Sequence, residues 1–239
     1  MKLSSVSIAA NLALVRERIA AAARCAGRNS DSVALMAVTK TFGVESIREA
    51  HAAGLRLFGE NRVQEFAAKA DAARALDGAH WHLIGHLQSN KAARAAELFD
   101  AVDTVDSLRI ARKLNAAADA RGTPMPVLIE INLAGEAAKS GVGPDSKELE
   151  DILYAAPQLE ALKITGLMAI PPFTANPEDS RPHFRRLRKL RDQLAARKLP
   201  GITTDILSMG MSHDFEIAIE EGSTCVRLGA AIFGERPKE

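Results

Sequence analysis

The sequence places a lysine, Lys40, directly after an apolar run at residues 33–39 that is typical of a buried strand. Apolar surroundings disfavour the ammonium form, so they lower the pKa of an amine from its free value of about 10.4. An amine with a lowered pKa can act as a nucleophile and bond to an aldehyde. The alternative is that Lys40 has left the strand and extends its amine into water, and this segment alone favours that interpretation.

Small and hydroxyl side chains gather in two later segments that could bind an anion. Ser208, Gly210 and Ser212 follow an apolar run near residues 205–209, and Gly229 and Ala230 follow another at residues 225–228. Small residues let backbone amides approach a phosphate, and the N-terminus of a helix favours negative charge. Taken alone, residues 208–212 are equally compatible with a helix-capping loop in which Ser212 is the N-cap.

Eight short apolar or β-branched runs alternate with stretches of helical periodicity, which is typical of a parallel sheet with crossover helices. They lie near residues 33–39, 55–58, 81–85, 101–105, 127–133, 164–170, 205–209 and 225–228. Eight such units in 239 residues favour an α/β fold of the (β/α)8 TIM-barrel type over an open doubly wound sheet. We expect a single domain over residues 1–239, with an additional helix over residues 6–26 and a proline-rich loop at residues 171–177.

Barrel proteins place their sites at the carboxyl ends of the strands, so the residues after each run are the candidates. Lys40 would then share one face of the barrel with the anion-binding segments after the seventh and eighth strands, where this fold commonly holds a phosphate. A molecule that carries both an aldehyde and a phosphate fits that pair of groups. Pyridoxal 5′-phosphate is such a molecule.

Six segments of the chain resemble the pyridoxal phosphate homeostasis proteins, and the resemblance runs over nearly the whole length. They are AVTK at 37–40, GENRVQE at 59–65, WHLIGHLQSNK at 81–91, GLMAIP at 166–171, SMGMS at 208–212 and VRLG at 226–229. The resemblance implies a type III pyridoxal phosphate fold, a barrel like the N-terminal domain of alanine racemase. It also implies a role in holding the cofactor in the cell and releasing it to apoenzymes.

The same resemblance implies roles for individual residues. Lys40 would form an aldimine with the cofactor, and Asn61 and Met209 would lie near its ring. Ser208, Gly210, Ser212, Gly229 and the backbone amide of Ala230 would bind the phosphate. Family members usually carry a small hydroxyl residue where this chain has Ala230, so one hydrogen bond worth about 1.5–3 kcal/mol would be missing.

Arg227 would lie beside the pyridine nitrogen, as the resemblance to the racemase barrel implies. An arginine that is always charged cannot accept a proton from that nitrogen and discourages its protonation, which makes the ring a weaker electron sink. The alternative for Arg227 is a surface or salt-bridging residue.

Two functions follow, and a second base distinguishes them. An amino-acid racemase of the alanine racemase type needs an acid or base on the face opposite the lysine, which in alanine racemase is a tyrosine from an added domain. This chain ends soon after Arg227, and its single tyrosine, Tyr154, falls in a helical pattern where we expect it to pack. The sequence therefore favours reversible cofactor binding without a catalytic residue, with the racemase as the alternative.

Composition limits the partners. Thirty-one basic and thirty acidic side chains nearly cancel, so no overall field attracts nucleic acid or a membrane. The two cysteines cannot form a disulfide framework and suggest a reducing compartment, so we expect a cytoplasmic protein. No apolar run approaches the ~18 residues of a membrane span. We expect a monomer, and the sequence leaves the formation of a dimer open.

Three further features have less specific interpretations. His80, His82 and His86 lack an accompanying carboxylate or thiolate with ligand spacing, so we expect hydrogen-bonded histidines and no metal. The basic stretch at residues 181–198 is expected to be the solvated face of a helix, because Phe184, Leu187, Leu190 and Leu194 recur at helical spacing. Lys139, near the expected site, is either solvated or a transient acceptor of the phosphate or aldehyde.

Overall fold

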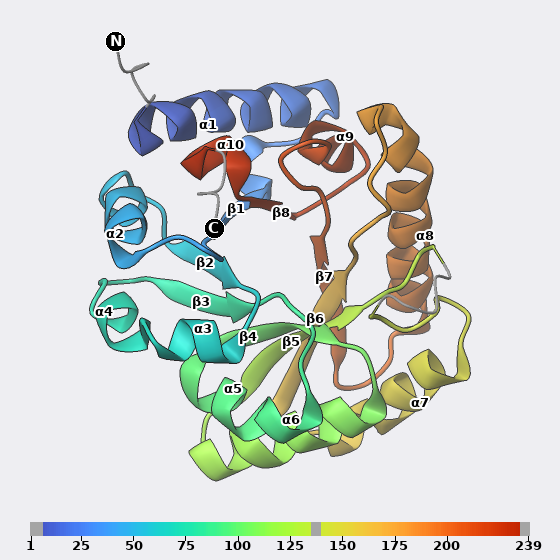
Figure 1. The fold of residues 1–239 in the computed structure, drawn as a ribbon. Helices are drawn as coiled ribbons and strands as arrows, with labels where there is room; N and C mark the ends of the chain where they lie inside the picture. Colours follow the sequence, from blue (N-terminus) through green and yellow to red (C-terminus); the bar gives the residue numbers. More distant parts are fainter. Residues whose placement is uncertain (1–6, 135–139, 235–239) are drawn as a thin grey trace.

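Eight parallel strands close into a barrel in the computed structural model, which describes residues 7–134 and 140–234 (Figure 1). Each strand pairs with its neighbours in sequence, and β8 pairs with β1 to complete the ring. The strands are β1 Ala34–Val38, β2 Leu57–Glu60, β3 His80–Leu83, β4 Ala101–Val105, β5 Met125–Glu130, β6 Leu162–Met168, β7 Ile202–Ser208 and β8 Cys225–Leu228. The predicted (β/α)8 barrel is confirmed.

Helices surround the barrel and cover the outer faces of the strands (Figure 1). The helix α8 shows why these segments are helical, because its large apolar side chains recur every three or four residues and are buried, while most of its other positions are polar. The helices after the strands are α2 Val44–Ala52, α3 Val63–Ala67, α4 Ala70–Arg74, α5 Ala92–Leu98, α6 Leu108–Arg121, α7 Lys147–Ala155, α8 Arg181–Arg197, α9 Phe215–Glu220 and α10 Ala230–Phe233.

An additional helix, α1 (Ile8–Cys25), precedes the first strand, as predicted. The Ser7 hydroxyl caps it by accepting a hydrogen bond from the Ala10 amide. Its buried face packs on α9 and α10, and the Asn11 side-chain amide donates to the Ile232 carbonyl. The helix therefore supports the end of the chain that follows β8.

Side chains alternate along the strands between the barrel interior and the layer under the helices. An aromatic cluster fills the outer layer beside β2 and β3, where Trp81 lies 4.7 Å from both Phe58 and Phe66, measured between ring centroids. The Phe99 ring extends this cluster at the same distance from Phe66. These contacts fix the two neighbouring strands whose carboxyl ends lead to Asn61 and Gly85.

Several strands lie two or three residues upstream of their predicted positions. β5 begins at Met125 and β7 at Ile202. The prediction placed both starts too late because Pro126, Thr203 and Thr204 interrupt the apolar pattern at the beginning of these strands. The expectation that Tyr154 packs is wrong, since 83% of this residue is exposed. Its neighbours Ile152 and Leu153 occupy the buried face of α7.

In the described part of the chain, no helix combines the length and the apolar character that crossing a membrane requires. Cys25 is exposed and Cys225 is buried, and both are free thiols.

Candidate functional site

A cavity of about 260 Å³ lies at the carboxyl ends of the strands, and it brings together six of the nine predicted site residues. Those six are Lys40, Asn61, Ser212, Arg227, Gly229 and Ala230, and the other lining residues are Val38, Ile84, Ile170, Met211 and His213. They come from segments that follow β1, β2, β3, β6, β7 and β8, or from the last residues of those strands. We call this space the mouth cavity.

Lys40 lies two residues beyond the last residue of β1. Thr39 before it is fully buried, whereas Lys40 itself is half-buried and lines the mouth cavity. The strand therefore delivers the lysine to the edge of the barrel interior, and its side chain does not simply extend away into water.

Arg227 is 4% exposed and projects from β8 into the barrel, so it is not a surface residue. Its guanidinium donates to the Ser208 hydroxyl at 2.7 Å and to the Ala169 carbonyl at 2.8 Å. Burial lowers the pKa of Arg227, and the nearby negative charges, including Asp103 and Glu130, oppose that change. Two hydrogen bonds thus fix the arginine at one wall of the mouth cavity.

Ser208, Met209 and Gly210 do not line the mouth cavity. Ser208 is the last residue of β7 and its hydroxyl is taken up by Arg227, while Met209 is buried in the main hydrophobic core. Gly210 has a φ of 97°, and a Cβ there would lie 2.6 Å from the Ala218 Cβ in α9. This segment supports the wall of the cavity, and the residues after it, Met211 and Ser212, form the lining.

Ser212 and the start of α10 face the mouth cavity together. The Ser212 hydroxyl accepts a hydrogen bond from the Ala231 amide at 3.3 Å, and the N-cap of α9 is Asp214, so the alternative in which Ser212 is the N-cap of the next helix does not apply. Since α10 has only four residues, its dipole contributes little at Gly229 and Ala230. This corner therefore offers backbone amides and one hydroxyl, the kinds of group that can bind an anion.

Two residues near the mouth were not predicted. His213 lines the cavity, with its Nε2 atom 3.1 Å from the Thr174 carbonyl and its ring centroid 5.3 Å from that of Phe173. The sequence signal that could have identified His213 is its position directly after the candidate anion-binding segment 208–212. Glu130 ends β5, is 4% exposed and accepts a hydrogen bond from the Ser140 hydroxyl at 2.9 Å, and burial raises its pKa.

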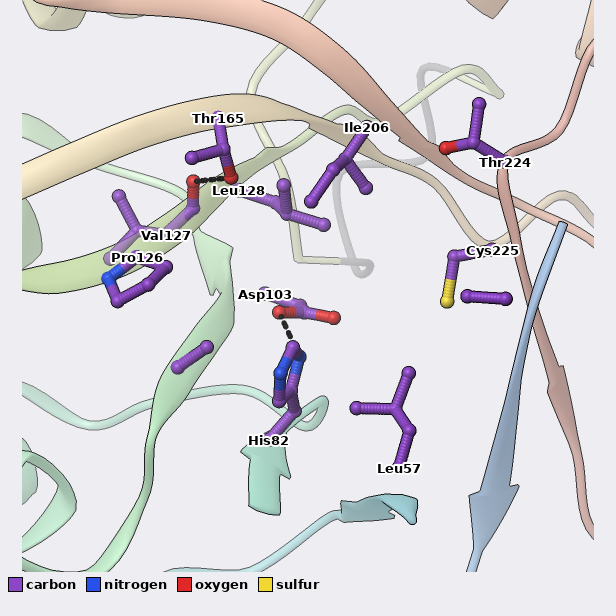
Figure 2. Close-up of a pocket in the computed structure, with 12 residues that line it drawn as sticks. Leu57, His82, Asp103, Pro126, Val127, Leu128, Thr165, Ile206, Thr224 and Cys225 are labelled. Carbon is purple, nitrogen blue, oxygen red and sulfur yellow. Dashed lines mark hydrogen bonds and ion pairs between the residues drawn. The ribbon is translucent and has the colours of Figure 1, made fainter. Parts of the chain in front are cut away.

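A second cavity, of about 110 Å³, lies deeper in the barrel (Figure 2). Its walls are mostly apolar, and one of them carries His82, whose Nδ1 atom is 3.0 Å from an oxygen of Asp103. Burial favours neutral His82, but the charges of Asp103 and Asp100 outweigh it and raise the pKa of His82. Apolar walls suit a phosphate poorly, so the mouth cavity is the better candidate for an anionic ligand.

The histidines differ in one respect from the expectation. Carboxylates do accompany two of them, since His82 pairs with Asp103 and His86 with Asp106, each at 3.0 Å. The prediction of hydrogen-bonded histidines is confirmed for these two. Among the residues that the structure describes, no group of three or more histidine, cysteine or acidic side chains could hold a metal. Lys139 lies outside the described residues.

Comparison with known proteins identifies relatives of the whole chain. Residues 10–237 match the family model of the alanine racemase N-terminal domain. The pyridoxal phosphate homeostasis proteins of Pseudomonas aeruginosa and Aquifex aeolicus are 46% and 44% identical, over 96% and 94% of this chain and 96% of each relative. PipY of Synechococcus elongatus, solved with PLP bound, is 36% identical with a TM-score of 0.83 over 95% of this chain and 100% of its own. This chain therefore belongs to the pyridoxal phosphate homeostasis protein family, within the alanine racemase N-terminal domain family.

Proposed function

We propose that this protein binds pyridoxal 5′-phosphate in the mouth cavity and takes part in holding the cofactor and releasing it to apoenzymes. The observation that carries the proposal is that Lys40 lines the same cavity as Ser212, Gly229 and Ala230, so an amine faces a space that also offers anion-binding groups. The relatives that bear the homeostasis name, and PipY with its bound PLP, support the same assignment.

The residues of the cavity fit the groups of the cofactor. When bound, pyridoxal phosphate supplies an aldehyde that bonds reversibly to amines. Lys40 would hold that aldehyde, and the Ser212 hydroxyl with the amides of Gly229 and Ala230 would bind the phosphate. Asn61 would lie beside the ring. We assign supporting roles to Ser208, Met209 and Gly210, since none of them lines the cavity.

Arg227 would hold its fixed positive charge near the ring nitrogen and keep that nitrogen unprotonated. Its hydrogen bond to Ser208 orients the guanidinium, so Ser208 would act on the cofactor through the arginine. A ring without a protonated nitrogen withdraws electrons weakly, which disfavours reactions that need a strong electron sink. The racemase barrel shares this arrangement, so the arginine by itself does not separate the two functions.

A racemase would need a second acid or base. Tyr154 cannot serve, because it is exposed near the end of α7, outside the residues that line the cavity. His213 does line the cavity, but the contact of its Nε2 atom with the Thr174 carbonyl engages one ring nitrogen. We infer a carrier that acts in the cytoplasm as a monomer, and both free cysteines support a reducing compartment.

The absorbance spectrum beside a borohydride experiment tests this function. Purified protein should absorb in the violet, and reduction should fix the cofactor to the peptide that contains Lys40, as read by mass spectrometry. Lys40→Ala should lose the absorbance and the label. Recovery of the label on Lys91, which lines a neighbouring polar cavity, would contradict the assignment.

A racemisation assay with the common amino acids separates the two functions. The carrier proposal predicts no inversion beyond that seen with Lys40→Ala. Inversion that depends on both Lys40 and His213, as judged with His213→Asn, would identify an enzyme and replace the carrier proposal.

A further inference from the structure

Three side chains that lie outside the lining of the mouth cavity hold the turn that carries Lys40. They are Glu60 at the end of β2, Glu65 in α3 and Lys69, which precedes α4. Glu60 faces outward from the barrel and is fully buried, and the Lys69 side chain is 10% exposed. These three residues form what we call the lysine brace.

Lys69 connects the two sides of the turn. Its ammonium lies 2.7 Å from Glu60 Oε1 and donates to the carbonyls of Thr39 at 3.1 Å and Phe42 at 3.3 Å. A lysine ammonium has three donors, and these acceptors use all three. Glu60 Oε1 also accepts a hydrogen bond from the Thr39 hydroxyl, so the residue before Lys40 is held through both its backbone and its side chain.

Glu65 holds the residue after Lys40. Thr41 has a φ of 69°, in the left-handed region that a β-branched residue rarely adopts. Its amide donates to Glu65 Oε1 at 2.7 Å. A sparsely populated conformation persists only where the surroundings impose it, and Glu65 is the side chain that does so here. Both neighbours of Lys40 are therefore fixed by residues from the end of β2 and from the segment that follows it.

We propose that Glu60, Glu65 and Lys69 are positioning residues, which fix the direction in which Lys40 enters the mouth cavity. The inference rests on the proposed function. It predicts that the brace is required for the bond between Lys40 and the aldehyde but not for recognition of the phosphate, because the proposed phosphate-binding groups follow β7 and β8 and begin α10. Lys69 and the two acidic residues touch no part of the cofactor space, so they act only through the turn.

Two vitamers separate these roles. Pyridoxal 5′-phosphate can bond to Lys40, whereas pyridoxine 5′-phosphate carries an alcohol in place of the aldehyde and cannot. Lys69→Met removes the ammonium and keeps the aliphatic chain. We expect it to weaken binding of the aldehyde by on the order of tenfold or more while binding of the alcohol stays unchanged, since small misplacements of a reacting group are costly. The control is Lys147→Met, which removes an exposed lysine paired with Asp151.

Loss of both vitamers to the same degree, or of neither, in folded Lys69→Met protein would overturn the inference. If Lys69→Met does not fold, Glu65→Ala replaces it, because it leaves the Glu60–Lys69 pair intact and removes the hydrogen bond to Thr41 together with a longer contact of 4.0 Å to Lys69. The same split between aldehyde and alcohol is expected. Its control is Glu45→Ala, in which the lost carboxylate is 82% exposed and pairs with Arg48.

A measurement without cofactor distinguishes failure of the brace from failure of the proposed function. In cofactor-free protein, Glu65→Ala should increase the hydrogen-exchange rate of the Thr41 amide and change the rate at which a small acylating reagent modifies Lys40. If wild-type protein does not prefer the aldehyde over the alcohol, the proposed function fails and these two rates alone judge the brace. Unchanged rates in both would sink it.

Discussion

At the scale of single residues, the barrel interior holds more charge than its apolar composition suggests. Arg227 lies near the negative charges of Asp103 and Glu130, and the His82 Nδ1 atom lies 3.0 Å from an oxygen of Asp103 (Figure 2). Buried charges are tolerated when they are paired and hydrogen-bonded. The charged pair of His82 and Asp103 is thus explained by protein stability, and its contribution to the free energy of unfolding should depend on pH.

His82→Asn tests that dependence, because asparagine can still donate to Asp103 but cannot become charged. The folded state raises the pKa of His82, so the stabilisation from its charge is present below the unfolded value of about 6.5 and is lost as pH rises through the folded value. We expect the variant to be less stable than wild type by about 2 kcal/mol near pH 6, with the difference shrinking toward pH 9.

Denaturant unfolding at several pH values measures this difference. The control is His80→Asn, which removes an exposed histidine from the same strand. A gap between wild type and His82→Asn that stays constant or widens with rising pH would rule out the charged pair.

Among single residues, the sequence could predict those whose place follows from their position along one strand, but not the contacts made between different strands. Lys40 and Arg227 follow from strand ends and apolar flanks, so they were accessible. Side chains alternate along β7, so Ser208 points into the barrel and Met209 points outward. These directions follow from the sequence once the strand boundaries are known. The partners of His82 and Lys69 were not accessible, because both contacts join residues from different strands or loops, 21 and 30 positions apart.

At the scale of elements, α8 is joined to the end of α9 by charge. The prediction that its apolar residues face the barrel is confirmed, but the arginines are not simply solvated. Three of them converge on Glu221, which is 5% exposed in its side chain, at distances of 2.9–3.1 Å from Arg181, Arg185 and Arg188. This arrangement explains a basic helix without a nucleic-acid partner.

Glu221→Gln should therefore cost about 2 kcal/mol of unfolding free energy, since it removes a buried carboxylate from three charged donors. Glu178→Gln is the matched control, because Glu178 binds the same Arg181 but its side chain is 56% exposed. Its effect should be much smaller, as is usual for exposed pairs. Equal effects of the two variants in thermal unfolding would contradict the special role of Glu221.

The junction between the ends of β2 and β3 leaves no room for a side chain at Gly85. A Cβ there would lie 2.1 Å from the Asn61 carbonyl oxygen, so Gly85→Ala must displace the segment that brings Asn61 to the mouth cavity. We expect a loss of about 1–3 kcal/mol in stability together with weaker cofactor binding. Gly143→Ala is the control, since its Cβ would meet only Ser146 at 3.4 Å. Unchanged cofactor affinity in Gly85→Ala would separate this junction from the site.

At the scale of the whole molecule, closure of the barrel explains why the sequence predicted the fold better than the site. Eight repeats of strand and helix specify a ring even when individual strands are misplaced by two or three residues. A site at the mouth depends instead on which side chains turn inward, and a shift of one residue reverses that. The brace behind Lys40 needs the ring itself, because β1 and β2 must be adjacent before Lys69 can reach the turn.

Closure also predicts how the cofactor should act on the stability of the whole protein. The proposed ligand would touch Lys40 after β1, Ser212 after β7 and Gly229 after β8, and would tie the first strand to the last. A ligand that binds only the closed barrel stabilises it by about 2.7 kcal/mol at a hundred times its Kd, which for a domain of this size raises Tm by about 5–10 °C. In cofactor-free wild type we expect this rise with pyridoxal 5′-phosphate and a smaller one with pyridoxine 5′-phosphate at the same concentration. Because Lys40→Ala retains the phosphate site but loses the covalent bond, it should respond equally to both ligands. A preference for the aldehyde that survives in Lys40→Ala would mean that another amine captures it.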